Sequence, residues 1–65
     1  MNETLTVMAK QNIYVRISVA AVDRKKKTYE AMEEMVALYI GMDWISADEA
    51  NEVLGYAQEK ITTAV

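Results

Sequence analysis

The chain has 65 residues, a net charge of −3, and neither cysteine nor histidine. So short a chain can form one hydrophobic core at most, and the missing residue types exclude disulfides, thiolate or imidazole metal sites and the commonest general base. The sequence has no membrane-spanning run and does not open on a signal-peptide pattern, so we expect a cytoplasmic protein without a membrane partner. We predict one small domain over residues 1–65, with no cofactor and no metal.

The first segment, residues 1–22, favours β-structure. Apolar and polar residues alternate over residues 13–19, and the apolar ones are β-branched. This period of two is typical of a half-buried strand. Leu5 and Val7 repeat the alternation, and the polar residues 10–12 could join two strands as a hairpin. The predicted fold class is therefore α+β, with an N-terminal strand or β-hairpin followed by two amphipathic helices.

The same segment also fits a helix, because no glycine or proline occurs before Gly41. Apolar residues at heptad-like steps form a seam that Asn12, Lys26 and Glu33 interrupt. The seam consists of Leu5, Met8, Val15, Val19, Val22, Tyr29, Val36 and Ile40. An all-α helical hairpin or bundle is thus the alternative fold.

Residues 28–42 are predicted to form the first amphipathic helix. Apolar residues at steps of three and four cover about half of its circumference, more than one packing partner requires. These residues are Tyr29, Met32, Met35, Val36, Leu38, Tyr39, Ile40 and Met42. We therefore expect this helix to contact two apolar partners.

Residues 46–62 are predicted to form the second helix. Gly41 is suited to end the preceding helix in a left-handed conformation. Ser46 and Glu49 match a capping box, the pattern that begins a helix by reciprocal side-chain and backbone hydrogen bonds. Alanines on the apolar stripe of this helix would allow the two helices to pack closely.

Charge is divided unevenly along the chain. Residues 1–27 carry six bases and two acids, whereas residues 28–65 carry eight acids and one base, so the two parts have charges of +4 and −7. Such asymmetry can serve attraction between copies of the chain, or it can present a charged face to another partner.

Nucleic-acid binding is one alternative function. A strand followed by two helices in a dimer is the plan of ribbon-helix-helix repressors, whose paired strands enter the major groove. Under that plan Tyr14, Arg16 and Ser18 would read bases, and the basic run Arg24, Lys25, Lys26 and Lys27 would contact phosphates. A second alternative is an inhibitor whose acidic face mimics nucleic acid.

Protein binding is the favoured function. Small domains without disulfides or metals commonly need a partner subunit, and 52% of the residues are hydrophobic, so we expect a homodimer formed through the strand edge, the first helix, or both. Flexible methionines and aromatic side chains suit contact with a larger protein target. The predicted partner-binding residues are Met35, Leu38, Tyr39, Met42 and Trp44. We expect a small acidic, non-catalytic adaptor or inhibitor of the kind found among bacterial and phage accessory proteins.

Overall fold

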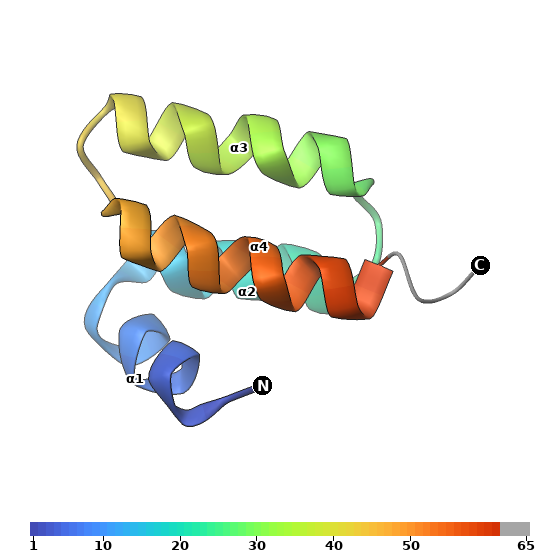
Figure 1. Cartoon of the computed structure of the whole chain (residues 1–65), viewed down its shortest axis with the longest axis horizontal. Coiled ribbons are helices and arrows are strands. Elements are labelled where there is room, and N and C mark those ends of the chain that lie inside the picture. The colour runs from blue at the N-terminus through green and yellow to red at the C-terminus, as the bar shows by residue number, and fades with distance from the viewer. Residues whose placement is uncertain (62–65) are drawn as a thin grey trace.

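A computed structural model describes residues 1–61, and these residues form four α-helices (Figure 1). The bounds are α1 Glu3–Gln11, α2 Ile13–Asp23, α3 Tyr29–Gly41 and α4 Ala47–Ile61. None of the described residues lies in a strand. The predicted α+β fold with an N-terminal strand or hairpin is therefore wrong, and the alternative of a helical bundle fits.

Among the three longer helices, α3 runs antiparallel to α2, and α4 runs antiparallel to α3 (Figure 1). The short α1 crosses one end of this bundle. Helix α4 packs against both α2 and α3, which also contact each other, and α1 packs against α2 and α4. One outer side of the α2 and α3 pair therefore has no helix of the described chain over it. No described helix has the length and apolar character needed to cross a bilayer.

The strand prediction fails because the period-two pattern of residues 13–19 also contains a period of four. Val15 and Val19 lie four residues apart on one side of α2 and are buried, whereas Ile13 and Ile17 lie on the other side and are exposed. A β-branched residue costs at most about 0.7 kcal/mol in a helix relative to alanine. Burying a valine gains about 1.5 kcal/mol or more, so packing outweighs local propensity.

Asn12 separates α1 from α2. Its backbone is extended, with φ −136° and ψ 118°, so the helix cannot continue through it. The Asn12 side-chain oxygen accepts a hydrogen bond from the Tyr14 N–H (2.9 Å), and its amide donates to the Trp44 carbonyl (2.9 Å). A single polar residue thus ends one helix, begins the next and holds the α3–α4 connection against them.

Ten apolar residues from all four helices and the α3–α4 connection form the core. They are Leu5, Val15, Val19, Val22, Met32, Val36, Ile45, Ala50, Val53 and Ala57. Five of them belong to the heptad-like seam of the sequence, but Ile40 of that seam is exposed. Ser18 is the buried polar residue, and its hydroxyl donates to the Tyr14 carbonyl at 2.8 Å, so its burial leaves no polar group unsatisfied.

The end of α3 differs in detail from the prediction. Gly41 keeps a negative φ, and the left-handed residue is Asp43, with φ 61°. The N–H groups of Asp43 and Trp44 donate to the carbonyls of Ile40 and Tyr39, both at 2.9 Å, which is the Schellman pattern. Aspartate adopts the left-handed region more readily than most residues, so it can replace glycine there.

The predicted capping box at the start of α4 is confirmed. The Ser46 N–H donates to the Glu49 carboxylate (2.8 Å), and the Glu49 N–H donates to the Ser46 hydroxyl (3.1 Å). These two bonds fix the point at which the chain returns from α3 to cover the core.

Candidate protein-binding face

Three aromatic rings gather where the first turn of α2 meets the end of α3. Tyr14 stacks on Trp44, with ring centroids 4.6 Å apart and planes 11° from parallel. Tyr39 contacts both rings, at centroid distances of 5.3 Å to Tyr14 and 5.8 Å to Trp44. Because Asn12 holds the Trp44 backbone, the cluster joins the α3–α4 connection to α2. Such ring pairs contribute about 0.5–1.5 kcal/mol each beyond the area that they bury.

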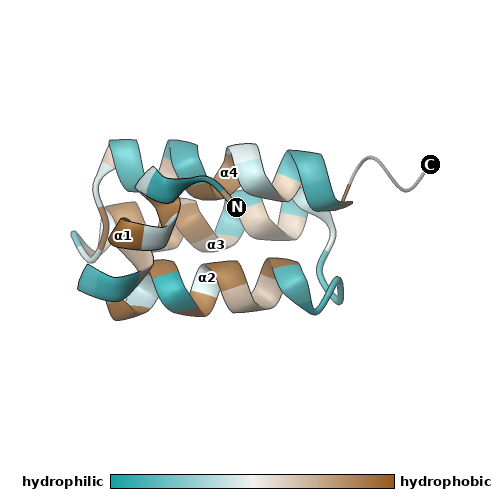
Figure 2. Cartoon of the chain, turned by 90° about the horizontal axis from the view of Figure 1, so that it is seen from below, coloured by the Kyte–Doolittle hydropathy of each residue, from teal (hydrophilic) through white to brown (hydrophobic). Residues whose placement is uncertain are grey.

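Large apolar side chains surround this cluster but remain exposed. Ile13 and Ile17 flank Tyr14 on α2, and Leu38 and Met42 flank Tyr39 on α3, at steps of one and three residues. We call this surface the α2/α3 face, and its exposed fractions are Ile13 53%, Ile17 44%, Leu38 59%, Met42 52% and Trp44 39%. Apolar segments recur along both helices in Figure 2. Within residues 1–61 the bundle therefore has two apolar sides, of which only one is covered by a helix.

The α2/α3 face has the composition of a contact surface. The exposed Trp44 and Met42 offer broad and adaptable apolar area, and the Trp44 ring is held in place by stacking on Tyr14 and by the hydrogen bond from Asn12 to its carbonyl. Exposed apolar patches of this kind mark interaction sites more often than isolated surface leucines do. Chemically, the face can exclude water from an apolar partner surface.

Five partner-binding residues were predicted from the sequence, and the structure places them between the middle of α3 and the α3–α4 connection that follows it. Leu38, Met42 and Trp44 are exposed, whereas Tyr39 and Met35 are partly buried against the core. Leu38, Met42 and Trp44 thus form the part of the α2/α3 face that lies on α3 and on the α3–α4 connection. The rest of the face, Ile13 and Ile17, is absent from the predicted set because a strand over residues 13–19 would bury these two side chains. Their spacing of four residues is the signal that a helical reading would have used.

The predicted base-reading residues do not share a surface. Tyr14 lies in the aromatic cluster and Ser18 is fully buried, so only Arg16 points into solvent. The paired strands of the ribbon-helix-helix plan also require a strand where α2 stands. This mode of DNA contact therefore does not suit the described chain.

The basic run lies at the opposite end of α2 from the aromatic cluster, about 16 Å away for an 11-residue helix. Arg24 caps α2, Lys25 has a left-handed φ of 54°, and Lys26 and Lys27 lead to the start of α3. All four side chains are exposed. The Thr28 hydroxyl accepts from the Ala31 N–H, so the first turn of α3 is capped by its own residue. The run is a solvated turn that carries a concentrated positive charge.

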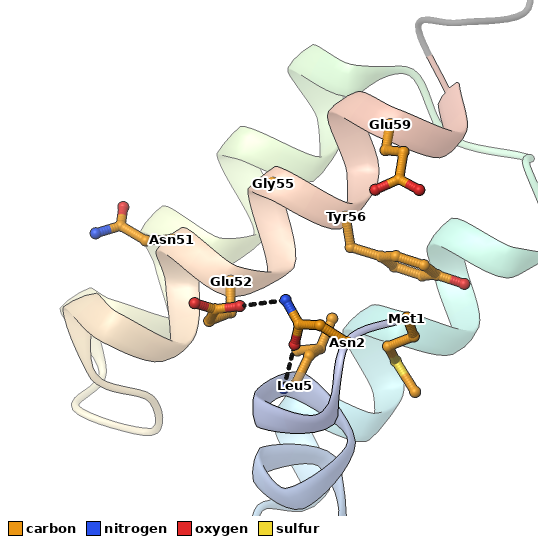
Figure 3. Close-up of a pocket in the computed structure, with 8 residues that line it drawn as sticks. All are labelled: Met1, Asn2, Leu5, Asn51, Glu52, Gly55, Tyr56 and Glu59. Carbon is orange, nitrogen blue, oxygen red and sulfur yellow. Dashed lines mark hydrogen bonds between the residues drawn. The ribbon is translucent and has the colours of Figure 1, made fainter.

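A polar cavity of about 530 Å³ lies between the start of α1 and α4 (Figure 3). Its lining residues are Met1, Asn2, Leu5, Asn51, Glu52, Gly55, Tyr56 and Glu59. The Asn2 amide donates to the Glu52 carboxylate at 3.1 Å, and the Asn2 side-chain oxygen accepts from the Leu5 N–H at 2.7 Å. These bonds cap α1 and attach it to α4, so the Asn2 and Glu52 side chains stabilise the fold at this cavity.

The Tyr56 hydroxyl, beside this cavity, donates a hydrogen bond to the Asp23 carboxylate. That bond, together with desolvation and the Asp23 charge, raises the pKa of Tyr56 from 10.0 to about 12. A phenol held protonated in this way is a poor nucleophile and a poor base at neutral pH. Over residues 1–61, no three carboxylates gather in a way that could hold a metal ion.

Comparisons with protein-family models, curated proteins and solved structures find no match to this chain.

Proposed function

We propose that this protein is a small acidic, non-catalytic binding protein, an adaptor or inhibitor, that contacts a protein partner through the α2/α3 face. The observation that carries the proposal is the group of four large aliphatic side chains exposed around an aromatic cluster whose Trp44 is itself exposed. Covering them would gain roughly 25 cal/mol for each Å² of apolar surface removed from water.

Two further features support a binding role. The chain has no histidine or cysteine, and Glu49 and Glu52 are engaged by the helix caps at Ser46 and Asn2. The aromatic cluster also makes the face rigid before any partner arrives, which lowers the entropy cost of binding. The exposed methionine and leucine then supply the adaptable contact area.

The proposal is tested with single substitutions on the face. A partner protein is captured from the native host and its affinity for the purified chain is measured by calorimetry. Leu38→Ser removes the most exposed large side chain of the face, and we expect about tenfold weaker binding, a loss typical of a central apolar contact.

The matched control is Val7→Ser, which changes an exposed apolar residue on α1, outside the face. We expect its affinity to stay within about twofold of the wild type, since surface substitutions away from a contact have small effects. Equal weakening by both substitutions, or none by Leu38→Ser, would rule out this face as the binding surface.

A further inference from the structure

The α2/α3 face has charged edges of opposite sign. On α2, Arg16 precedes Ile17, and Arg24 caps the helix next to the lysines of the turn. On α3, Glu30 and Glu34 lie four residues apart on one side of the helix, and Glu34 lies four residues before Leu38. All four charged side chains are exposed. An apolar strip therefore runs between a positive edge on α2 and a negative edge on α3.

The positive charges on α2 and the negative charges on α3 lie at similar heights along the bundle. Helices α2 and α3 are antiparallel, and the Tyr14 and Tyr39 rings lie side by side. Arg16, two residues after Tyr14, is thus about level with position 37 of α3, within one turn of Glu34. Arg24, ten residues after Tyr14, is about level with position 29, next to Glu30. Each positive charge has a negative charge at nearly the same height on the other edge.

We infer that the partner of this face is a second copy of the chain, packed so that α2 of one copy lies over α3 of the other. A twofold axis parallel to the helices produces this arrangement and uses the same surface on both copies. It brings Arg16 over Glu34 of the partner and Arg24 over Glu30 of the partner, twice each. The inference rests on the proposed function, because it assigns the occupant of the same face.

Electrostatics distinguishes this packing from the other twofold arrangement. An axis perpendicular to the helices would place α2 over α2 and α3 over α3, so arginine would face arginine and glutamate would face glutamate. Juxtaposed like charges are penalised at an interface, whereas complementary edges fix its register. The apolar strip is covered in both arrangements, so the charges decide between them.

Charge reversal tests the arrangement. One variant, Arg16→Glu with Arg24→Glu, makes both edges negative, and a second, Glu30→Lys with Glu34→Lys, makes both edges positive. We expect the wild type to sediment as a dimer, with twice the 7.3 kDa mass of the chain, and each variant alone to dimerise at least about tenfold more weakly. An equimolar mixture of the two variants should recover the dimer, because each negative edge then meets a positive one.

The matched control for the second variant is Glu33→Lys with Asp48→Lys, which makes the same change of net charge at two exposed positions. Asp48 lies in the first turn of α4, as Glu30 lies in the first turn of α3, so the control also matches the effect on a helix start. We expect the control to dimerise like the wild type. Circular dichroism of every variant establishes that the helices are retained. A wild-type dimer that neither variant weakens, or a mixture that stays monomeric, would overturn the α2-on-α3 packing.

The outcome also separates this inference from the proposed function. A wild type that stays monomeric up to about millimolar concentration, with Leu38→Ser still weakening a captured partner, would overturn self-association and leave the binding face in place. If Leu38→Ser changes neither sedimentation nor partner binding, both proposals fall.

Discussion

The two apolar sides of the bundle carry the same kinds of side chain but differ in what covers them. Met32 and Val53 are completely buried where α4 packs on α2 and α3, whereas Leu38 and Ile17 stand exposed on the α2/α3 face. Isoleucine, leucine and methionine occur on both sides, so these residue types do not by themselves indicate which side is covered. The difference shows that a helix with a broad apolar sector can stabilise the fold with one part of it and leave the other part for a contact.

The largest expected effect is the difference in stability between a substitution on the covered side and one on the exposed face. Met32→Ala removes a fully buried side chain and leaves a cavity, so it should lower the free energy of unfolding by about 2–5 kcal/mol. Leu38→Ala, on the α2/α3 face, should change it by no more than about 0.5 kcal/mol in the monomer. Urea denaturation at a protein concentration below any self-association, followed by circular dichroism, measures both. Similar losses for the two would mean that the face belongs to the core.

A smaller effect is expected at Asn12, whose side chain joins the start of α2 to the α3–α4 connection. Asn12→Ala removes the cap of α2 and the bond to the Trp44 carbonyl, and should cost about 1–2 kcal/mol. Trp44 should also become more exposed to solvent, with a red shift of its fluorescence.

The control for Asn12 is Asn51→Ala, at an exposed position inside α4. Alanine is the better helix former, so this variant should match or slightly exceed the wild type in stability. Unchanged fluorescence in Asn12→Ala would show that stacking on Tyr14 holds Trp44 without the asparagine.

The smallest effect concerns the bond between Tyr56 and Asp23, which attaches α4 to the end of α2 on the covered side. The pKa of Tyr56 is raised from 10.0 to about 12 in the folded chain, so folding favours the neutral phenol. The resulting stabilisation is complete below pH 10, decreases between pH 10 and 12, and is lost above that range. Because the bond lies at the surface, we expect it to contribute less than about 1 kcal/mol.

Tyr56→Phe tests this contribution by urea denaturation at pH 8 and at pH 11. The difference in unfolding free energy between the wild type and the variant should be smaller at pH 11. A difference that grows with pH would contradict the raised pKa.

Much of the second half of the molecule could be predicted from local signals. The capping box at Ser46 and Glu49 depends only on residues three apart, and it forms as expected. The apolar periodicity of residues 28–42 likewise anticipated a helix with more apolar surface than one neighbour can cover, and α3 runs from Tyr29 to Gly41 with Leu38 and Met42 exposed.

The first half could not be predicted in this way, since Ile13, Val15, Ile17 and Val19 satisfy a period of two and a spacing of four equally well. Only the rest of the chain decides between them, because burial of Val15 and Val19 against the other helices outweighs the weak preference of β-branched residues for strands. The capping box of α4 depends only on neighbouring residues, so the sequence by itself determined that feature. Which apolar side is covered depends on where α4 packs, and only the tertiary structure could reveal that Ile13 and Ile17 join Leu38 and Met42 on one exposed face.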